Sequence, residues 1–119
     1  MLFRSPYCLD SHASFLRSNG GSKDLLLSLS AGQLDDSSIS PSERSLLEFV
    51  AKVTLESHKI SPADIKVLSD AGWDQSAIAE AVHIVGLFAF FNRVANAFGL
   101  QSQYLSDLNT ASFGPREEQ

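Results

Sequence analysis

Cys8 and His12 are the residues of this chain best suited to chemistry. Cys8 is its one cysteine, and His12 follows four residues later, about one helical turn. Ser5-Pro6 predicts a helix start, with serine as the N-cap and proline at the first helical position. Cys8 then lies in the first turn, where backbone N–H groups and the helix dipole favour a thiolate. Asp10, two residues after Cys8, lies about 200° around the helix from it and therefore points elsewhere.

Two interpretations of this pair follow from the residues alone. A histidine on the same helix face as a thiol can take its proton, or relay it to a substrate oxygen, so Cys8 would be a nucleophile. A lone cysteine on a helix is also commonly a small buried apolar residue without reactivity.

The elements around this pair are predicted to be helical throughout. Ser40-Pro41 and Ser61-Pro62 repeat the start signal, and glycines supply the stops. Helices are expected over about 6–19, 23–31, 41–58 and 62–71, with a last one from an Asp74 cap to just before Gly99. We therefore predict an all-α fold: a single compact helical domain of about five to six helices spanning 1–119. Its tail, 101–119, is expected to be partly disordered.

The last predicted helix is apolar on nearly every side, which is typical of a buried helix. Its apolar positions are Ile78, Val82, Val85, Leu87, Phe88, Phe90, Phe91 and Val94, followed by Phe98. We expect four short helices in so small a domain to cover such a helix incompletely. We therefore expect the remainder to face another copy of the chain, as a homo-oligomer.

Charge and composition exclude several classes of function. The net charge is −5 and the lysines and arginines form no run, which argues against nucleic acid as a partner. The apolar run 84–91 is about a third of a bilayer span, so no membrane association is expected. A single cysteine and an N-terminus without a signal-peptide pattern favour the cytoplasm. Three histidines without other ligands at suitable spacing predict no metal site, and no cofactor is expected.

Tyr7-Cys8-x-x-x-His12 and the capped segment 40–49 together resemble the alkyl hydroperoxidase D-like, or carboxymuconolactone decarboxylase, superfamily. Residues 70–99, with Phe91-Asn92-Arg93-Val94-Ala95, are similar to its peroxidase-related branch in particular. The resemblance covers about residues 3–101. It implies a helical oligomer and an antioxidant thiol peroxidase activity.

The family's peroxidase motif is Glu, eleven residues, then Cys-x-x-Cys-x-x-x-His. Carried over by position, Cys8 is the cysteine that attacks the hydroperoxide and His12 is the relay histidine. The partner cysteine falls on Ser5, and the glutamate falls before Met1. Because Ser5 cannot form a disulfide, a sulfenic acid at Cys8 would need a thiol from a second chain or an external thiol reductant.

Three further residues are candidates for supporting roles. His83, with Glu80 three residues before it, is interpreted as a core histidine; the alternative is a replacement relay near Cys8. Arg93 is interpreted as the partner of a carboxylate, and the alternative is a contact to an anionic substrate.

Three functional hypotheses remain open at this point. The first is a thiol peroxidase using Cys8 and His12. The second is a catalytically diverged oligomeric scaffold or binding protein of the same family, which the incomplete motif favours. The third is a carboxymuconolactone-type decarboxylase, with Arg93 or His12 contacting the carboxylated lactone.

Overall fold

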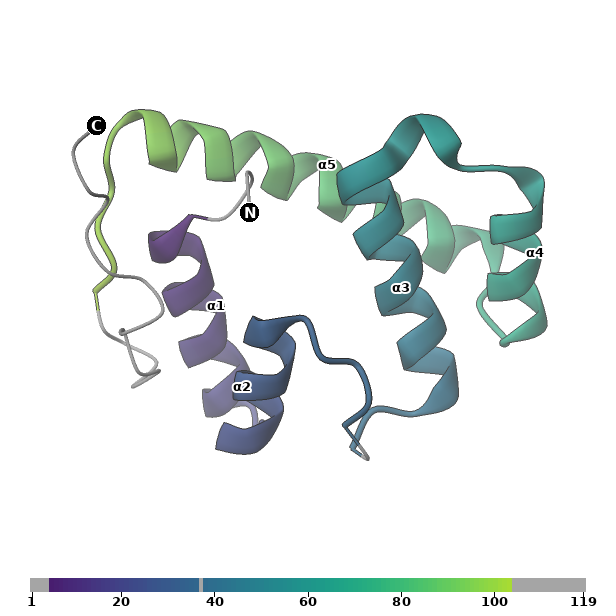
Figure 1. Ribbon diagram of the computed structural model, residues 1–119, viewed down its shortest axis with the longest axis horizontal. Coiled ribbons are helices and arrows are strands. Elements are labelled where there is room, and N and C mark those ends of the chain that lie inside the picture. Colours follow the sequence, from purple (N-terminus) through teal and green to yellow (C-terminus); the bar gives the residue numbers. More distant parts are fainter. Residues whose placement is uncertain (1–4, 37, 104–119) are drawn as a thin grey trace. The chain divides into compact units, whose positions relative to one another are not determined.

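The computed structural model describes residues 5–36 and 38–103, and every regular element in these residues is helical. Figure 1 shows α1 (Pro6–Ser18), α2 (Lys23–Ala31), α3 (Pro41–Glu56), the 3₁₀ turn η1 (Ser57–Lys59), α4 (Pro62–Asp70) and α5 (Gln75–Ala97). The predicted all-α class is confirmed, and so are the positions of the five predicted helices. The third ends two residues early because the chain tightens into η1. Of the predicted tail, residues 104–119 lie outside the described residues.

The chain divides into two compact units. One consists of Met1–Gly32 with Phe91–Gln119, and the other of Gln33–Phe90. The helix α5 contributes its last turns to the first unit and the remainder to the second. The single domain expected over 1–119 stays a prediction.

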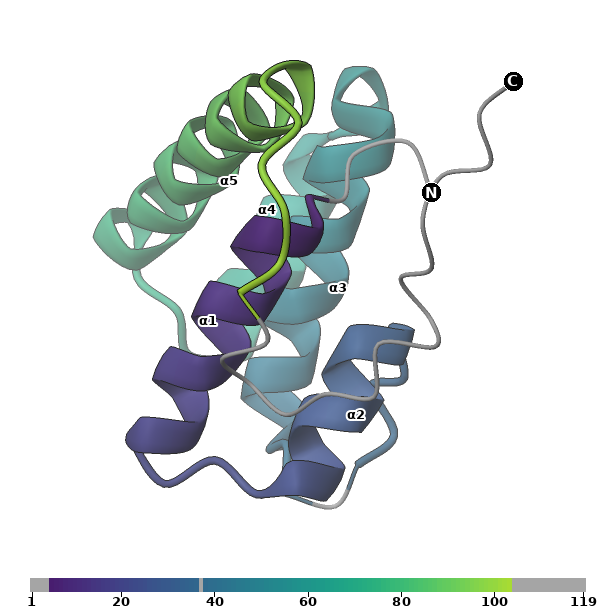
Figure 2. The same cartoon turned by 90° about the vertical axis from the view of Figure 1, so that its left-hand side faces the viewer.

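In the first unit, α1 and α2 form a helical hairpin (Figure 2). Gly20 turns the chain at a φ of 95°, a conformation that glycine adopts without strain. A Cβ added at Gly21 would stand 2.8 Å from Leu16 Cγ, so glycine lets the chain pass close to α1. Leu16, in the last turn of α1 before these glycines, packs against the buried pair Ala13 and Leu26. This contact holds α1, the helix that carries Cys8, against α2.

The second unit is built around three buried side chains, Phe49 of α3, Leu68 of α4 and Ile78 of α5. The half-buried apolar residues that surround them are Leu46, Val53, Ile60, Ile65 and Trp73. Trp73 Nε1 also donates to the carbonyl oxygen of Ser42 at 3.0 Å. The Ser42 hydroxyl donates to the carbonyl oxygen of Ala71 at 2.8 Å. These two bonds join the start of α3 to the junction between α4 and α5.

The predicted helix starts are confirmed in atomic detail for α3. The Ser40 hydroxyl accepts from Glu43 N at 3.2 Å, and the Glu43 carboxylate accepts from Ser40 N at 2.9 Å. Hydrogen bonds from the Ser40 side chain and backbone hold the pKa of Glu43 below its ordinary value. This reciprocal cap satisfies two backbone N–H groups that the helix itself leaves without partners.

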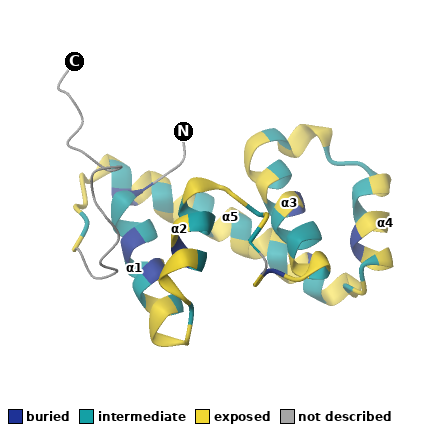
Figure 3. Ribbon diagram, turned by 60° about the horizontal axis from the view of Figure 1, so that its bottom comes forward, coloured by how far each residue is buried: buried dark blue, intermediate teal, exposed yellow. Residues whose placement is uncertain are grey.

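The apolar helix α5 is less buried than a helix that is apolar on nearly every side is expected to be. Ile78 is buried in the core, and Ala95 is buried in the first unit. Its exposed large apolar side chains are Val82, Ile84, Leu87, Phe90, Phe91 and Val94. Figure 3 shows exposed residues along much of its length. By length and composition α5 could cross a membrane, and 6% of its apolar window is buried. The core helix of a soluble protein passes the same test but is mostly buried.

Candidate functional site

Cys8 lies in the first turn of α1, where the predicted cap places it. The Ser5 hydroxyl, which is buried with 2% of its residue surface exposed, accepts a hydrogen bond from Cys8 N at 3.3 Å. The Cys8 thiol is free and half-buried. Ser5 is therefore a structural part of this site, because it fixes the backbone at the cysteine.

His12 is anchored to the same turn through its ring. Its Nδ1–H donates to the Cys8 carbonyl oxygen at 2.7 Å, since a carbonyl can only accept. In the neutral ring this bond places the lone pair on Nε2, which is then the atom that can take a proton. The side chain is exposed. A thiol and a basic imidazole nitrogen thus share one helical turn, as the spacing predicts.

Asp10 is a residue that the sequence reasoning set aside. It is buried, with 6% of its surface exposed, on the same helix as Cys8. Among the described residues, no buried side-chain nitrogen or oxygen lacks a hydrogen-bond partner. The available signal was its spacing, because Asp10 lies three residues before the buried Ala13 and shares its helix face.

The other predicted residues are divided between the two units. Glu80 and His83 belong to the second unit, and both are exposed. His83 Nδ1–H donates to the Ala79 carbonyl oxygen at 2.7 Å, so the prediction of a buried core histidine is wrong, although its ring is anchored. Arg93 belongs to the first unit, with Cys8, and is also exposed. A relay role for Glu80 and His83, and a substrate contact by Arg93, stay hypotheses.

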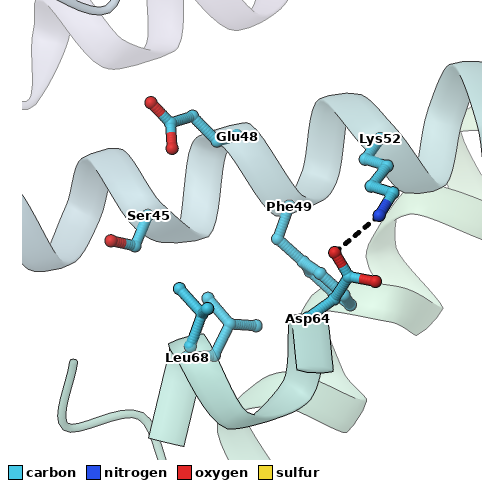
Figure 4. Close-up of a pocket in the computed structure, with 7 residues that line it drawn as sticks. Ser45, Glu48, Phe49, Lys52, Asp64 and Leu68 are labelled. Carbon is cyan, nitrogen blue, oxygen red and sulfur yellow. Dashed lines mark hydrogen bonds and ion pairs between the residues drawn. The ribbon is translucent and has the colours of Figure 1, made fainter. Parts of the chain in front are cut away.

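A pocket of about 140 Å³ lies between α3 and α4 in the second unit (Figure 4). Its lining consists of Ser45, Glu48, Phe49, Lys52, Asp64, Val67 and Leu68. Lys52 Nζ contacts Asp64 Oδ1 at 2.6 Å, and Ser61 donates its N–H and its hydroxyl to Asp64 Oδ2 at 2.8 Å each.

These contacts decide what the pocket can do. The hydrogen bonds from Lys52 and then Ser61 lower the pKa of Asp64 to about 2. An ionised carboxylate whose two oxygens already accept hydrogen bonds is a structural ion rather than an acid or base. Within the described ranges, 5–36 and 38–103, no group of three or more His, Cys, Asp or Glu residues could hold a metal ion. Cys8 and His12 are therefore the better candidate for catalysis.

Comparisons with known proteins give one informative result. No family model matches the chain, and no curated protein matches it. It is similar to the crystal structure of an uncharacterized peroxidase-related protein from Silicibacter sp. TM1040, with 28% sequence identity and a TM-score of 0.69. The chain has a peroxidase-related fold. The match covers 84% of this chain and 52% of the other, so the chain spans about half the length of that protein.

Proposed function

We propose that this protein is a thiol peroxidase of the alkyl hydroperoxidase D-like type, with Cys8 as the nucleophile and His12 as the proton carrier. The observation that carries the proposal is the His12 Nδ1–H bond to the Cys8 carbonyl, which holds a basic ring nitrogen on the turn of the free thiol. The similarity to a peroxidase-related protein supports the same chemistry.

The proposed first step is reduction of a hydroperoxide by the cysteine. His12 Nε2 takes the Cys8 thiol proton, and the sulfur attacks the terminal oxygen of the peroxide. The O–O bond breaks as the S–O bond forms, so sulfur is oxidised by two electrons and becomes a sulfenic acid. The proton on His12 passes to the departing alkoxide, which leaves as an alcohol.

The second step requires a reductant from outside the motif. Ser5 has no sulfur, and its hydroxyl already accepts the Cys8 N–H bond. An external thiol therefore condenses with the sulfenic acid, releasing water and forming a mixed disulfide. A second thiol molecule attacks that disulfide, which restores Cys8 and releases the oxidised reductant.

Consumption of cumene hydroperoxide in the presence of dithiothreitol tests the proposal. Cys8→Ser should reduce the rate to the uncatalysed background, and His12→Gln should lower it by about 10²-fold or more, the usual contribution of a positioned acid–base group. His58→Gln is the matched control, because His58 is an exposed histidine on η1 and should leave the rate unchanged. A Cys8→Ser protein as active as the wild type would overturn the mechanism.

Ser5 favours a second candidate, a diverged binding or scaffold protein of the same type. A buried serine stands there in the place of the partner cysteine of the peroxidase motif. In that case peroxide would not be consumed at all. Cys8 would also fail to form a dimedone adduct after addition of one equivalent of hydroperoxide. The decarboxylase hypothesis is tested separately by adding a carboxymuconolactone, whose loss of CO₂ should be absent if the peroxidase proposal is right.

A further inference from the structure

The pocket between α3 and α4 combines an apolar surface with one ion pair. Phe49 and Leu68, which also belong to the core of the second unit, supply the buried part of the lining. Val67 adds an exposed apolar side chain. Lys52 and Asp64 lie beside the ring of Phe49 and turn toward each other (Figure 4). Apolar walls with a few polar groups are the usual composition of a site for a small molecule.

The size of this pocket restricts what it can hold. Its volume is about 140 Å³. An apolar cavity of roughly 150 Å³ accepts one benzene molecule, whereas sites for drug-sized ligands begin at about 300 Å³. The pocket therefore suits a molecule with a single ring and has no room for a nucleotide.

The ion pair offers a proton donor and an acceptor at one place. Among the described residues, Lys52 Nζ donates to Asp64 Oδ1 alone, although an ammonium has three protons to donate. The two hydrogen bonds from Ser61 go to the other oxygen of Asp64, Oδ2. Oδ1 can accept a further hydrogen bond, and Lys52 Nζ can donate one. A hydroxyl group, which both accepts and donates, complements this pair.

The charges at the pocket favour an uncharged ligand. Hydrogen bonds from Lys52 and then Ser61 lower the pKa of Asp64 to about 2, so the pair is ionised at neutral pH and its charges cancel. A ligand carboxylate would be repelled by Asp64, and a ligand ammonium would be repelled by Lys52. Glu48 also lines the pocket, but its carboxylate points away from Asp64 and Leu68 (Figure 4).

We propose that this pocket binds a simple one-ring phenol. The ring packs on Phe49 and Leu68, and an aromatic ligand gains more from a phenylalanine ring than an aliphatic chain of equal area does. The ligand hydroxyl accepts a hydrogen bond from Lys52 Nζ and donates one to Asp64 Oδ1. The site binds its ligand without transferring a proton, because Asp64 stays ionised.

A titration followed by the amide signals of the protein in ¹H–¹⁵N NMR spectra tests the site, with phenol as the probe. Phenol should shift signals of α3 and α4 in a saturable way, with a dissociation constant of about 1 mM, which is reasonable for so small a ligand. Benzene lacks the hydroxyl, and benzoate and benzylammonium carry a charge. Each of these three should bind at least about fivefold more weakly, the effect of one lost hydrogen bond.

Three variants separate the ion pair from the apolar surface. Lys52→Met removes the donor and should weaken phenol binding at least about fivefold while leaving benzene binding unchanged. Lys66→Met is the matched control, because Lys66 forms an exposed ion pair with Asp70 at 2.7 Å and does not line the pocket. Val67→Trp adds a large ring at an exposed position of the lining and should abolish the binding of both phenol and benzene. Circular dichroism verifies that all three variants fold.

Several results would overturn the proposal. No saturable shift up to about 10 mM phenol, ten times the expected dissociation constant, would show that the pocket is not a phenol site. Phenol binding that persists in Val67→Trp would place the ligand elsewhere on the protein. Unchanged binding in Lys52→Met, or benzoate that binds as tightly as phenol, would remove the role of the ion pair. The proposal does not rest on peroxidase activity, which the Cys8→Ser comparison tests separately.

Discussion

Replacing Ser5 by cysteine tests whether Cys8 occupies the attacking position of a two-cysteine motif. Ser5 and Cys8 are joined by a cap hydrogen bond of 3.3 Å, from the N-cap to the third helical residue. In Ser5→Cys, a hydroperoxide should convert Cys8 to a sulfenic acid. The new thiolate should then attack that sulfur, releasing water and closing an intramolecular disulfide. The wild type has no second thiol with which to close it.

The stability of the reduced and oxidised variant can be estimated from the structure. Loss of a serine cap costs about 1 kcal/mol, and cysteine sulfur is a weak acceptor, so reduced Ser5→Cys should be less stable than wild type by about that amount. For a chain of this length, the melting temperature should fall by roughly 4 °C. A disulfide across a four-residue loop contributes at most about 2 kcal/mol by the loop-closure relation. The oxidised variant should therefore melt above the reduced one.

The assay counts thiols and measures mass after one equivalent of cumene hydroperoxide. Ser5→Cys should lose both thiols and 2 Da while remaining a single chain. Ser5→Ala, which loses the cap without adding a sulfur, should show the same loss of stability and no disulfide. Two thiols that persist after peroxide treatment, or a disulfide that forms only between chains, would refute the assignment of Ser5 and Cys8 to the motif.

Three other predictions concern the second unit. Leu68→Ala should destabilise the protein by about 3 kcal/mol in urea unfolding, because its side chain is fully buried, whereas Val67→Ala, at an exposed position, should change stability by less than about 0.5 kcal/mol. The pKa of Asp64 is lowered to about 2 in the folded protein, from an ordinary value of 3.8. Its stabilising contribution is therefore present above about pH 4 and is lost as the pH falls toward 2. Asp64→Asn should remove this part of the acid dependence of unfolding. Trp73→Phe keeps an aromatic ring but loses the hydrogen bond to the Ser42 carbonyl. It should lower the free energy of unfolding by about 1 kcal/mol, measured by circular-dichroism melting. An unchanged stability would contradict the role of that bond.

The helix starts were predictable because their causes are local. Ser40 and Glu43 are three residues apart, and the bonds between them depend on the helix alone. The same holds for the bond from Cys8 N to Ser5, which lies within one turn. Pattern reasoning works at these places because the interacting groups are already neighbours in the sequence.

Other features depend on packing and could not be derived from periodicity. Lys52 and Asp64 are twelve residues apart and meet only because α3 and α4 fold back on each other. The burial of Asp10 depends likewise on what covers α1. For α5 the pattern correctly indicated an apolar helix, yet it could not decide which side the other helices cover. In the second unit that side is marked by Ile78, which packs with the buried Phe49 and Leu68.

The cap at α1 shows why helix formation and redox function compete at one position. A hydroxyl at Ser5 accepts the Cys8 N–H well, whereas a thiol there would accept it poorly but could resolve a sulfenic acid. Ser5 therefore strengthens the start of the helix and at the same time prevents the internal disulfide. If Cys8 turns over peroxide, its rate must depend on the concentration of an external thiol, and Ser5→Cys should make the first disulfide independent of it. A wild-type rate that does not change with thiol concentration would contradict this argument.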